Sequence, residues 1–261
     1  MCTSAPPPPP PPTPKPLAFL GASTGCGLTA LTPAIQTGTT CLALCRTPSK
    51  LATLAAKYPA TLIIKAGNAH NAKDILSILT HSGSPVSAIS FSIGNKPDFS
   101  AAARESADPN VCEKGMRALL EALATMRSSG FSGWYPLLSV VSTTGISDSG
   151  RDIPLLLYPL YHVLLAVPHA DKRVMESLLR DSGERFVLVR PSLLVDGKGE
   201  GDGKRVRVGL EDVRSGRVVR REVGWTISRK TVGEWMFGNL LSRADPELEV
   251  KVEGMAVSLT W

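Results

Sequence analysis

The chain has 261 residues, of which 43% are hydrophobic and 20% charged, and its formal net charge is +6. This composition is typical of a globular protein rather than a disordered one, and the length suits one α/β domain. No apolar stretch is long enough to span a membrane and no signal peptide is visible, so we expect neither a membrane protein nor a secreted one. The five cysteines are odd in number and form no CxxC pair, which favours a reduced, cytoplasmic setting over a disulfide framework.

The excess of positive charge gathers in residues 198–221, where basic residues alternate with four carboxylates. Alternating charge of this kind is typical of a solvated loop or hairpin. The segment also lacks the interleaved aromatic side chains on which nucleic-acid bases would stack. We therefore expect no nucleic-acid partner.

The first sixteen residues differ in composition from the rest of the chain. The run from Pro6 to Pro12 has no backbone donors and a fixed φ, so it predicts an extended polyproline segment outside the fold. A disordered tail is the simpler interpretation, and a ligand for a proline-binding module is the alternative. We expect residues 1–16 to form this tail and residues 17–261 to form a single domain.

Strand and helix patterns alternate after the tail. Short apolar strands are expected at Leu17–Leu20, Thr40–Leu44, Thr61–Ile64, Val86–Ile93, Leu137–Ser142 and Phe186–Arg190. Helices are expected at Thr24–Gln36, Pro48–Lys57, Ala72–Thr80, Asn110–Met126 and Asp171–Asp181, the last ending before Gly183. The order predicts an α/β fold of the Rossmann type, a doubly wound parallel sheet with helices on both faces. Residues 192–229 form a small polar insertion, for which we expect a hairpin on the substrate side.

A glycine-rich loop follows the first expected strand and opens the first expected helix. Its glycines are Gly21, Gly25 and Gly27, and Ser23, Thr24 and Cys26 lie between them. Only a residue without a Cβ lets a pyrophosphate approach the backbone closely, and the helix beyond offers unpaired N–H groups and a partial positive charge. The loop therefore predicts a dinucleotide site, whereas an ordinary glycine turn is the alternative.

The end of the second strand indicates which dinucleotide is bound. A site for NAD places an acid there, whereas an arginine suits the 2′-phosphate of NADP. Arg46 stands at this position, Ser49 and Lys50 follow, and no acid lies in the turn. The alternative is a solvated arginine at a strand end. We favour NADP(H) as the cofactor.

These residues resemble the short-chain dehydrogenase/reductase superfamily, in its atypical NAD(P)H-binding, NmrA-like branch. The resemblance spans Leu17 to about Leu241 and includes the glycine loop, the turn at Arg46, Val187–Pro191 and Ile227–Arg229 before a helix. More narrowly, three segments are similar to the fungal averufin oxidase-like oxidoreductases: Val141–Ser147, Pro168–Glu176 and Met255–Thr260. That resemblance implies NADPH-linked redox chemistry on a phenolic or quinonoid substrate, as found in secondary metabolism.

The chain departs from the superfamily pattern at two places. Standard members carry a Tyr-x-x-x-Lys pair, but Pro168 stands four positions before Lys172. Relatives commonly have Gly-Asp near the adenine, and this chain has Asn68 after Gly67, which can still hydrogen-bond the adenine amino group.

Several residues follow strands whose carboxyl ends border the site. Gly94 and Asn95 should lie beside the cofactor, as should Pro191 at the end of the last strand. Ser142 or Thr143 could donate to a substrate oxygen, and Lys172 could bond the ribose hydroxyls, a role the superfamily gives to its lysine. The candidates for the proton donor are Tyr161, His162 and His169.

Each candidate also has a structural explanation. The hydroxyls could cap turns, Lys172 could be a solvated residue at a helix start, and Tyr161 and the histidines could serve packing. Cys26 could be a reactive thiol near helix N–H groups or a small residue chosen for fit. No cluster of side chains has metal-ligand spacing, so we expect no metal.

Three functions are consistent with these features. The leading one is an NADPH-dependent oxidoreductase, a monomer or homodimer, acting on an aromatic, polyketide-like small molecule. The second is a non-catalytic NADP(H)-binding sensor or pathway accessory protein, favoured by the absence of the Tyr-x-x-x-Lys pair. The third, an epimerase or dehydratase, suits the fold but lacks a clear tyrosine base.

Overall fold

The computed structural model describes residues 15–95, 108–159, 161, 163, 165–197, 205–243 and 252–261. The proline run and His162 lie outside these ranges, so the expectations for the tail and for that histidine concern residues that are not described.

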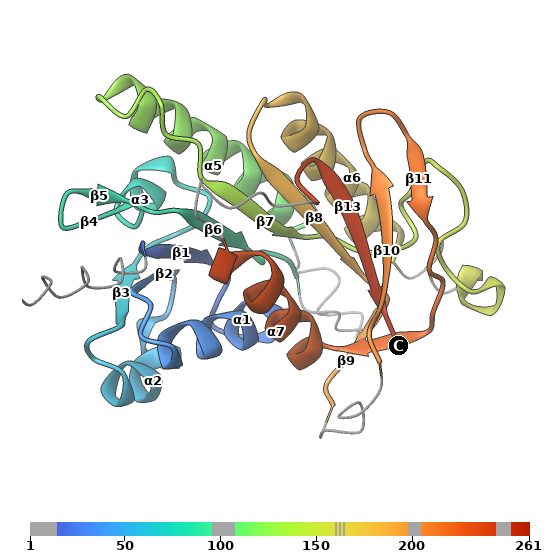
Figure 1. Ribbon diagram of the computed structural model, residues 1–261, viewed down its shortest axis with the longest axis horizontal. Coiled ribbons are helices and arrows are strands. Elements are labelled where there is room, and N and C mark those ends of the chain that lie inside the picture. The colour runs from blue at the N-terminus through green and yellow to red at the C-terminus, as the bar shows by residue number, and fades with distance from the viewer. Residues whose placement is uncertain are drawn as a thin grey trace, which may run out of the picture.

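A nine-stranded sheet runs through the protein in the order β11-β10-β13-β8-β7-β6-β1-β2-β3 (Figure 1). Seven of its strands run parallel to one another: β1 (Leu17–Leu20), β2 (Cys41–Cys45), β3 (Leu62–Ala66), β6 (Ala88–Phe91), β7 (Leu137–Val141), β8 (Phe186–Pro191) and β13 (Met255–Thr260). Two antiparallel strands, β10 (Arg207–Asp212) and β11 (Arg217–Arg220), extend one edge. This is the Rossmann-type α/β fold expected from the alternating pattern.

The chain reverses its direction of travel across the sheet between β1 and β6, which pair with each other. From β1 the chain moves outward to β2 and β3, and it then returns to β6 on the other side of β1. In open α/β sheets, ligands bind outside the carboxyl ends of the strands at such a switch point. The topology therefore directs attention to the loops that follow β1 and β6.

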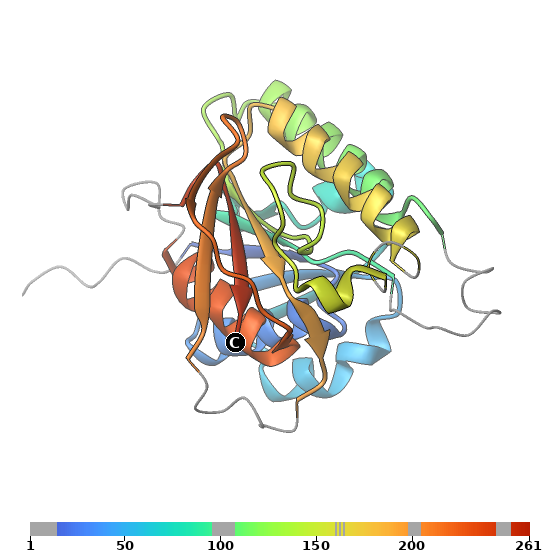
Figure 2. The same cartoon turned by 90° about the vertical axis from the view of Figure 1, so that its right-hand side faces the viewer.

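Helices cover both faces of the sheet (Figure 2). On one face α1 (Gly25–Gln36) and α7 (Arg229–Asn239) pack against Leu17 and Phe19 of β1. On the other face α3 (Ala72–Leu76), α5 (Val111–Ser128) and α6 (Ala166–Asp181) pack against its Ala18 and Leu20. Successive residues of a strand point to opposite faces, so a strand covered on both sides is apolar along most of its length.

The expected boundaries differ from the observed ones in three helices. The expected helix at Pro48–Lys57 begins as a 3₁₀ turn at Pro48–Leu51 before α2 (Ala52–Lys57). Helix α3 ends at Leu76 rather than Thr80, because Thr80 belongs to β4 (Thr80–His81), which pairs with β5 (Ser84–Pro85). Helix α6 begins five residues earlier than expected, with Pro168 in its first turn, where proline is tolerated.

The segment 192–229 holds more structure than one hairpin. Strands β10 and β11 form an antiparallel hairpin, and β9 (Leu193–Val195) pairs with β12 (Thr226–Ser228) in a separate two-stranded sheet. The hairpin was expected on the substrate side, but it lengthens the main sheet beyond β13. Strand β13 itself comes from the end of the chain and was not among the expected strands.

Within the described residues, no helix combines the length and the apolar character that crossing a membrane requires. The described cysteines, Cys26, Cys41, Cys45 and Cys112, are all buried free thiols.

Candidate functional site

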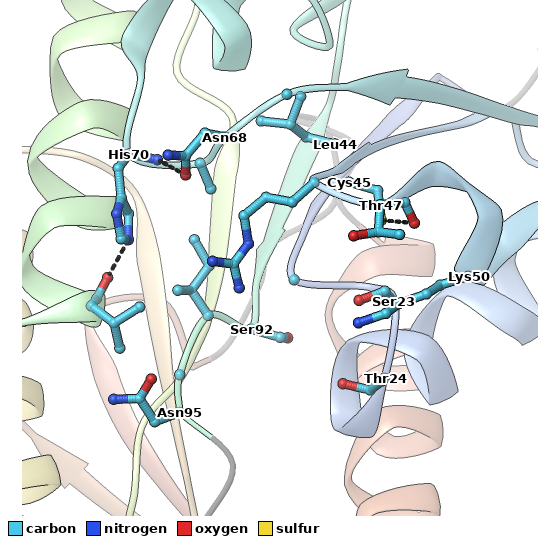
Figure 3. A pocket seen from close by; sticks show the side chains of 17 residues that line it. Ser23, Thr24, Leu44, Cys45, Thr47, Lys50, Asn68, His70, Ser92 and Asn95 are labelled. Carbon is cyan, nitrogen blue, oxygen red and sulfur yellow. Dashed lines mark hydrogen bonds between the residues drawn. The ribbon is translucent and has the colours of Figure 1, made fainter. Parts of the chain in front are cut away.

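A pocket of about 350 Å³ opens at the carboxyl ends of β1, β2, β3 and β6. Ser23, Thr24, Thr47 and Lys50 lie on one side of it, and Asn68, His70 and Asn95 lie on the other (Figure 3). Its remaining lining residues are Gly21, Leu44, Cys45, Arg46, Gly67, Ala69, Ser92, Ile93, Gly94 and Val111. The pocket therefore occupies the switch point of the sheet.

The glycine loop approaches neighbouring backbone so closely that side chains would not fit. Gly21 has a φ of +84°, and a Cβ there would lie 2.6 Å from the carbonyl oxygen of Ser92. A Cβ on Gly27 would lie 2.6 Å from the carbonyl oxygen of Gly21, so this glycine lets α1 pack directly behind the turn. A side chain at either position would clash with neighbouring backbone, so both positions need glycine, as in the turns that bind dinucleotides.

The N-terminus of α1 lacks the side-chain cap that α3 and α7 have. Its N-cap Thr24 makes no side-chain hydrogen bond to the helix, and no acidic residue lies in the first turn. By contrast, Asn71 accepts hydrogen bonds from the first turn of α3, and Ser228 accepts one from Thr231 in α7. The first N–H groups of α1 are therefore available to an anion.

Two cations border the first pocket. Arg46 and Lys50 are exposed and line it, and among the described residues neither side chain has an ion-pair partner. None of the residues lining the pocket is a carboxylate. Ser49, also expected at the phosphate, is exposed but does not line the pocket, whereas its neighbour Thr47 does.

Backbone and side-chain hydrogen bonds fix the loop after β3. The N–H of Asn68 donates to Oδ2 of Asp74 at 2.8 Å, and Oδ1 of Asn68 accepts from the N–H of His70 at 3.1 Å. The His70 ring lies 3.1 Å from the carbonyl oxygen of Val111 (Figure 3). Asn68 thus borders the pocket where the sequence placed it, but its side-chain oxygen already accepts one bond.

A second pocket, of about 460 Å³, adjoins the first. It shares Thr24, Ser92, Ile93, Gly94 and Asn95 with the first pocket. Its other lining residues are Gly25, Cys26, Leu28, Val141, Ser142, Lys172, Leu194, Asp196 and Arg229. The two pockets meet at the glycine loop, an arrangement that suits a ligand with two halves joined by a pyrophosphate.

Ser142 and Lys172 meet in the second pocket. Ser142 follows β7 and is only 3% exposed, and its Oγ has no hydrogen-bond partner among the described residues. Lys172 donates from Nζ to the carbonyl oxygen of Val141 at 2.9 Å, next to Ser142. Because α6 begins at Ala166, Lys172 lies in the second turn of the helix. The alternative of a solvated lysine at a helix start is therefore wrong, since Lys172 is not at the start.

Cys26 also lines the second pocket, with its thiol largely buried. Burial raises the pKa of this thiol to about 11, and the positive charges of Arg229 and Lys172 lower it only in part. At neutral pH the group is therefore a thiol and a poor nucleophile. The structure favours a small residue chosen for fit at this position.

The other expected catalytic residues do not line either pocket. Tyr161 is 2% exposed, and its ring packs against Gly145 and against the ring of His169, whose centroid is 5.2 Å away. Burial raises the pKa of Tyr161. Thr143 donates from Oγ1 to the carbonyl of Thr144.

Pro191, expected at the cofactor, is buried at the end of β8. Its carbonyl accepts a hydrogen bond from the N–H of Thr144. It therefore supports the loop after β7 instead of lining a pocket.

Two charged residues in the second pocket were not among the predicted site residues. Arg229 and Asp196 form an ion pair at 2.7 Å, at the entrance to α7 and after β9. The motif Ile227–Arg229 before a helix could have indicated the arginine, but nothing local marks Asp196. His70 and Ser92 were likewise missed, whereas Asn95, which was expected beside the cofactor with Gly94, lines both pockets.

Groups of three or more metal-ligating side chains are not found among the described residues.

Comparisons with known proteins agree with this site. A family model described as NAD(P)H-binding matches residues 21–240. Among curated proteins, the chain is 37% identical to Reductase pytE of Aspergillus terreus, over 94% of this chain and 97% of the relative. It is 38% identical to Oxidase pynE of Aspergillus niger, over 85% of this chain and 91% of the relative.

Solved structures show the same fold at low sequence identity. A short-chain dehydrogenase/reductase of wide type from Veillonella parvula DSM 2008, solved in complex with NADP, superposes with a TM-score of 0.66 at 15% identity, covering 95% of this chain and 94% of that one. ChuY, an anaerobilin reductase from Escherichia coli O157:H7, gives a TM-score of 0.62 at 17% identity, covering 94% and 96%. On the match of the family model and of the fungal relatives, the chain belongs to the NAD(P)H-binding family.

Proposed function

We propose that this protein is an NADPH-dependent oxidoreductase that acts on an aromatic, polyketide-like small molecule. The observation that carries the proposal is the pair of adjoining pockets that meet at the uncapped end of α1. One pocket presents two cations, and the other presents a buried hydroxyl beside a lysine.

The preference for NADPH over NADH rests on the first pocket. A 2′-phosphate carries close to two negative charges, and Arg46 offers a planar fork of donors to bind it. Lys50 adds a second positive charge, and no carboxylate lines the pocket to bind a ribose 2′-hydroxyl or to repel the phosphate.

The second pocket supports chemistry at a carbonyl oxygen. A bound nicotinamide supplies or accepts a hydride at its C4 carbon. The Ser142 hydroxyl, buried and without a partner, can donate to the substrate oxygen as negative charge develops there. One N–H of the Lys172 ammonium is bound to Val141, which leaves two donors for the ribose hydroxyls.

The substrate class rests on sequence similarity. The segments Val141–Ser147, Pro168–Glu176 and Met255–Thr260 resemble averufin oxidase-like enzymes of aromatic polyketide pathways. The two fungal relatives are named as a reductase and an oxidase, which supports redox chemistry in either direction.

A second candidate function is NADP(H) binding without turnover. It is favoured by the position of Tyr161 and His169, which line neither pocket, together with the absence of a Tyr-x-x-x-Lys pair. In this function the chain would act as a sensor or as an accessory protein of its pathway.

Turnover on a substrate panel separates the two functions. The full chain is mixed with NADPH and with quinones, anthrones and aromatic ketones, and the absorbance of NADPH is followed. The proposal expects NADPH oxidation with at least one compound and a fall of about 10²-fold or more in kcat in Ser142→Ala, because a donor to the developing oxyanion is lost. Ser177→Ala, which removes a hydroxyl from α6 outside both pockets, is the matched control and should leave kcat unchanged.

Tight binding of NADPH without turnover on any compound would contradict the enzyme and support the sensor. Turnover that survives intact in Ser142→Ala would remove that residue from the reaction.

A further inference from the structure

The first turn of α7 packs against the first turns of α1 and is hydrogen-bonded to them. The carbonyl oxygen of Arg229 accepts a hydrogen bond from Oγ1 of Thr29 at 2.7 Å. One turn further on, Gly233 has no side chain, and a Cβ there would lie 2.6 Å from the backbone nitrogen of Ala30. The backbone of Arg229 is therefore held at a fixed place beside the glycine loop.

The side chain of Arg229 extends along that loop. Its Cδ lies 3.7 Å from the position that a Cβ on Gly25 would take, and its positive charge lowers the pKa of the Cys26 thiol, although burial has the larger, opposite effect. Arg229 lines the second pocket together with Thr24, Gly25 and Cys26. The guanidinium thus adds a full positive charge at the place where α1 presents its uncapped N–H groups.

Asp196 is the partner of this guanidinium and the one carboxylate among the residues that line the second pocket. Its Oδ1 lies 2.7 Å from Nη1 of Arg229, but its side chain is 90% exposed, whereas that of Arg229 is 21% exposed. An ion pair with such an exposed partner contributes little free energy, because water and salt screen it. A ligand with a higher negative charge can therefore displace Asp196.

An independent observation indicates that this pocket receives a polar ligand. The Oγ of Ser142, in a residue 97% buried, has no hydrogen-bond partner among the described residues and lines the same pocket. Ser90 and Ser139 also have hydroxyls without a partner, but they line neither pocket, whereas Ser142 lines one, so a ligand or water there can complete its hydrogen bond.

We infer that Arg229 binds the pyrophosphate of the nicotinamide dinucleotide and that Asp196 competes with the pyrophosphate for the same guanidinium. This inference rests on the proposed function, since it assumes that the dinucleotide spans the two pockets. The pyrophosphate, rather than an anionic group of the substrate, is favoured because the Arg229 side chain lies beside Gly25 and shares the pocket lining with Thr24 and Cys26. A guanidinium can bind two phosphate oxygens at once, which an ammonium does with less geometric definition.

Opposite effects of two substitutions test the competition. Binding of NADPH and of NADH to the full chain is measured by titration calorimetry for wild type, Arg229→Gln and Asp196→Asn. We expect Arg229→Gln to weaken both cofactors by the same factor, about ten-fold or more, because both share the pyrophosphate. We expect Asp196→Asn to strengthen the binding of both cofactors by about two- to five-fold. The gain is this small because the exposed ion pair that no longer competes contributes little free energy.

Lys230→Gln is the matched control. It removes the same charge from the next residue of α7, which is exposed and does not line the pocket. The control should leave both affinities unchanged. Melting temperatures of the three variants show whether a loss of binding reflects a loss of fold.

Three results would overturn the inference while leaving the proposed function intact, provided that wild type binds NADPH. Unchanged cofactor affinity in Arg229→Gln is the first, and a raised KM for substrate in that variant would then assign the arginine to the substrate. The second is weaker binding in Asp196→Asn, which would make the ion pair structural. The third is a loss confined to NADPH, which would assign Arg229 to the 2′-phosphate. Failure of wild type to bind either cofactor would instead refute the proposed function.

Discussion

Arg46 is the residue on which the choice of cofactor depends. It lines the first pocket with Lys50, and no described carboxylate neutralises either cation. We expect Arg46→Ala to weaken NADPH binding by about 1.5–3 kcal/mol, because a charged hydrogen bond to the 2′-phosphate is lost. NADH binding should barely change, and fluorescence titration with both cofactors measures the difference.

Lys65→Ala is a suitable control for the loss of one nearby charge. Lys65 is exposed on β3 beside Leu44 but does not line the pocket. An equal loss of NADPH and NADH affinity in Arg46→Ala would contradict the phosphate role.

Cys26 gives a prediction about pH. Because burial raises the pKa of its thiol to about 11, almost none of it is thiolate at pH 7.5. We expect iodoacetamide to modify Cys26 far more slowly than free glutathione at pH 7.5, and the rate to rise as the pH approaches 11. Mass spectrometry of the peptide measures the rate, and alkylation as fast as that of the free thiol at pH 7.5 would contradict the raised pKa.

The residues that sequence reasoning could find are those fixed by local rules. Gly21 and Gly27 were visible because a turn between a strand and a helix needs close backbone contact, and Arg46 because it ends a strand. Tyr161 could not be judged from sequence, since its burial depends on the turn at Gly145 against which it packs. Arg229 reaches the glycine loop from about 200 positions away, through its contact with Thr29.

At the scale of elements, one carboxylate joins two helices. Asp171 of α6 is 4% exposed and accepts hydrogen bonds at 2.8 Å from the backbone N–H groups of Cys112 and Glu113, at the start of α5. Asp171→Ala leaves these donors buried without a partner and should lower the free energy of unfolding by about 1.5–3 kcal/mol. Urea denaturation measures this change.

Asp181→Ala is the control, because it removes a carboxylate from the other end of the same helix. Its side chain is 71% exposed, so the change should stay within about 0.5 kcal/mol. Equal effects of the two substitutions would show that Asp171 does not cap α5.

Elements defined by their own periodicity were predictable, and those defined by their partners were not. Strands β1 and β2 are continuous apolar runs buried on both faces, and β7 and β8 are apolar except for Ser139 and Arg190, a pattern that the sequence shows directly. Strand β13 pairs with β8 and β10, so its place depends on strands far away in the sequence. The first turn of α6 was missed, although Pro168 within that turn is compatible with a helix.

At the scale of the whole molecule, a buried ionic network ties three parts of the fold together. Arg190 of β8 binds Glu176 of α6 at 2.6 Å and Glu211 of β10 at 3.1 Å. Glu211 also accepts hydrogen bonds from Ser147 and Ser149, in the loop after β7. The network therefore links the helix that carries Lys172 to the edge of the sheet.

Removing one member of the network should destabilise the protein strongly. We expect Glu176→Gln to lower the free energy of unfolding by about 3 kcal/mol, because the charge of Arg190 remains buried with one carboxylate fewer. Glu253→Gln breaks a partly exposed pair with Arg185 and should cost less than about 1 kcal/mol. Thermal or urea unfolding compares them, and similar losses would argue against a special role for the buried network.

The central claim is that the turn between β1 and α1 receives the pyrophosphate of a nicotinamide dinucleotide across two adjoining pockets. Titration of the purified full chain with NADPH, followed by calorimetry, tests it most directly. We expect saturable binding of one NADPH per chain, tighter than that of NADH. Absence of binding by either dinucleotide at millimolar concentration would contradict it.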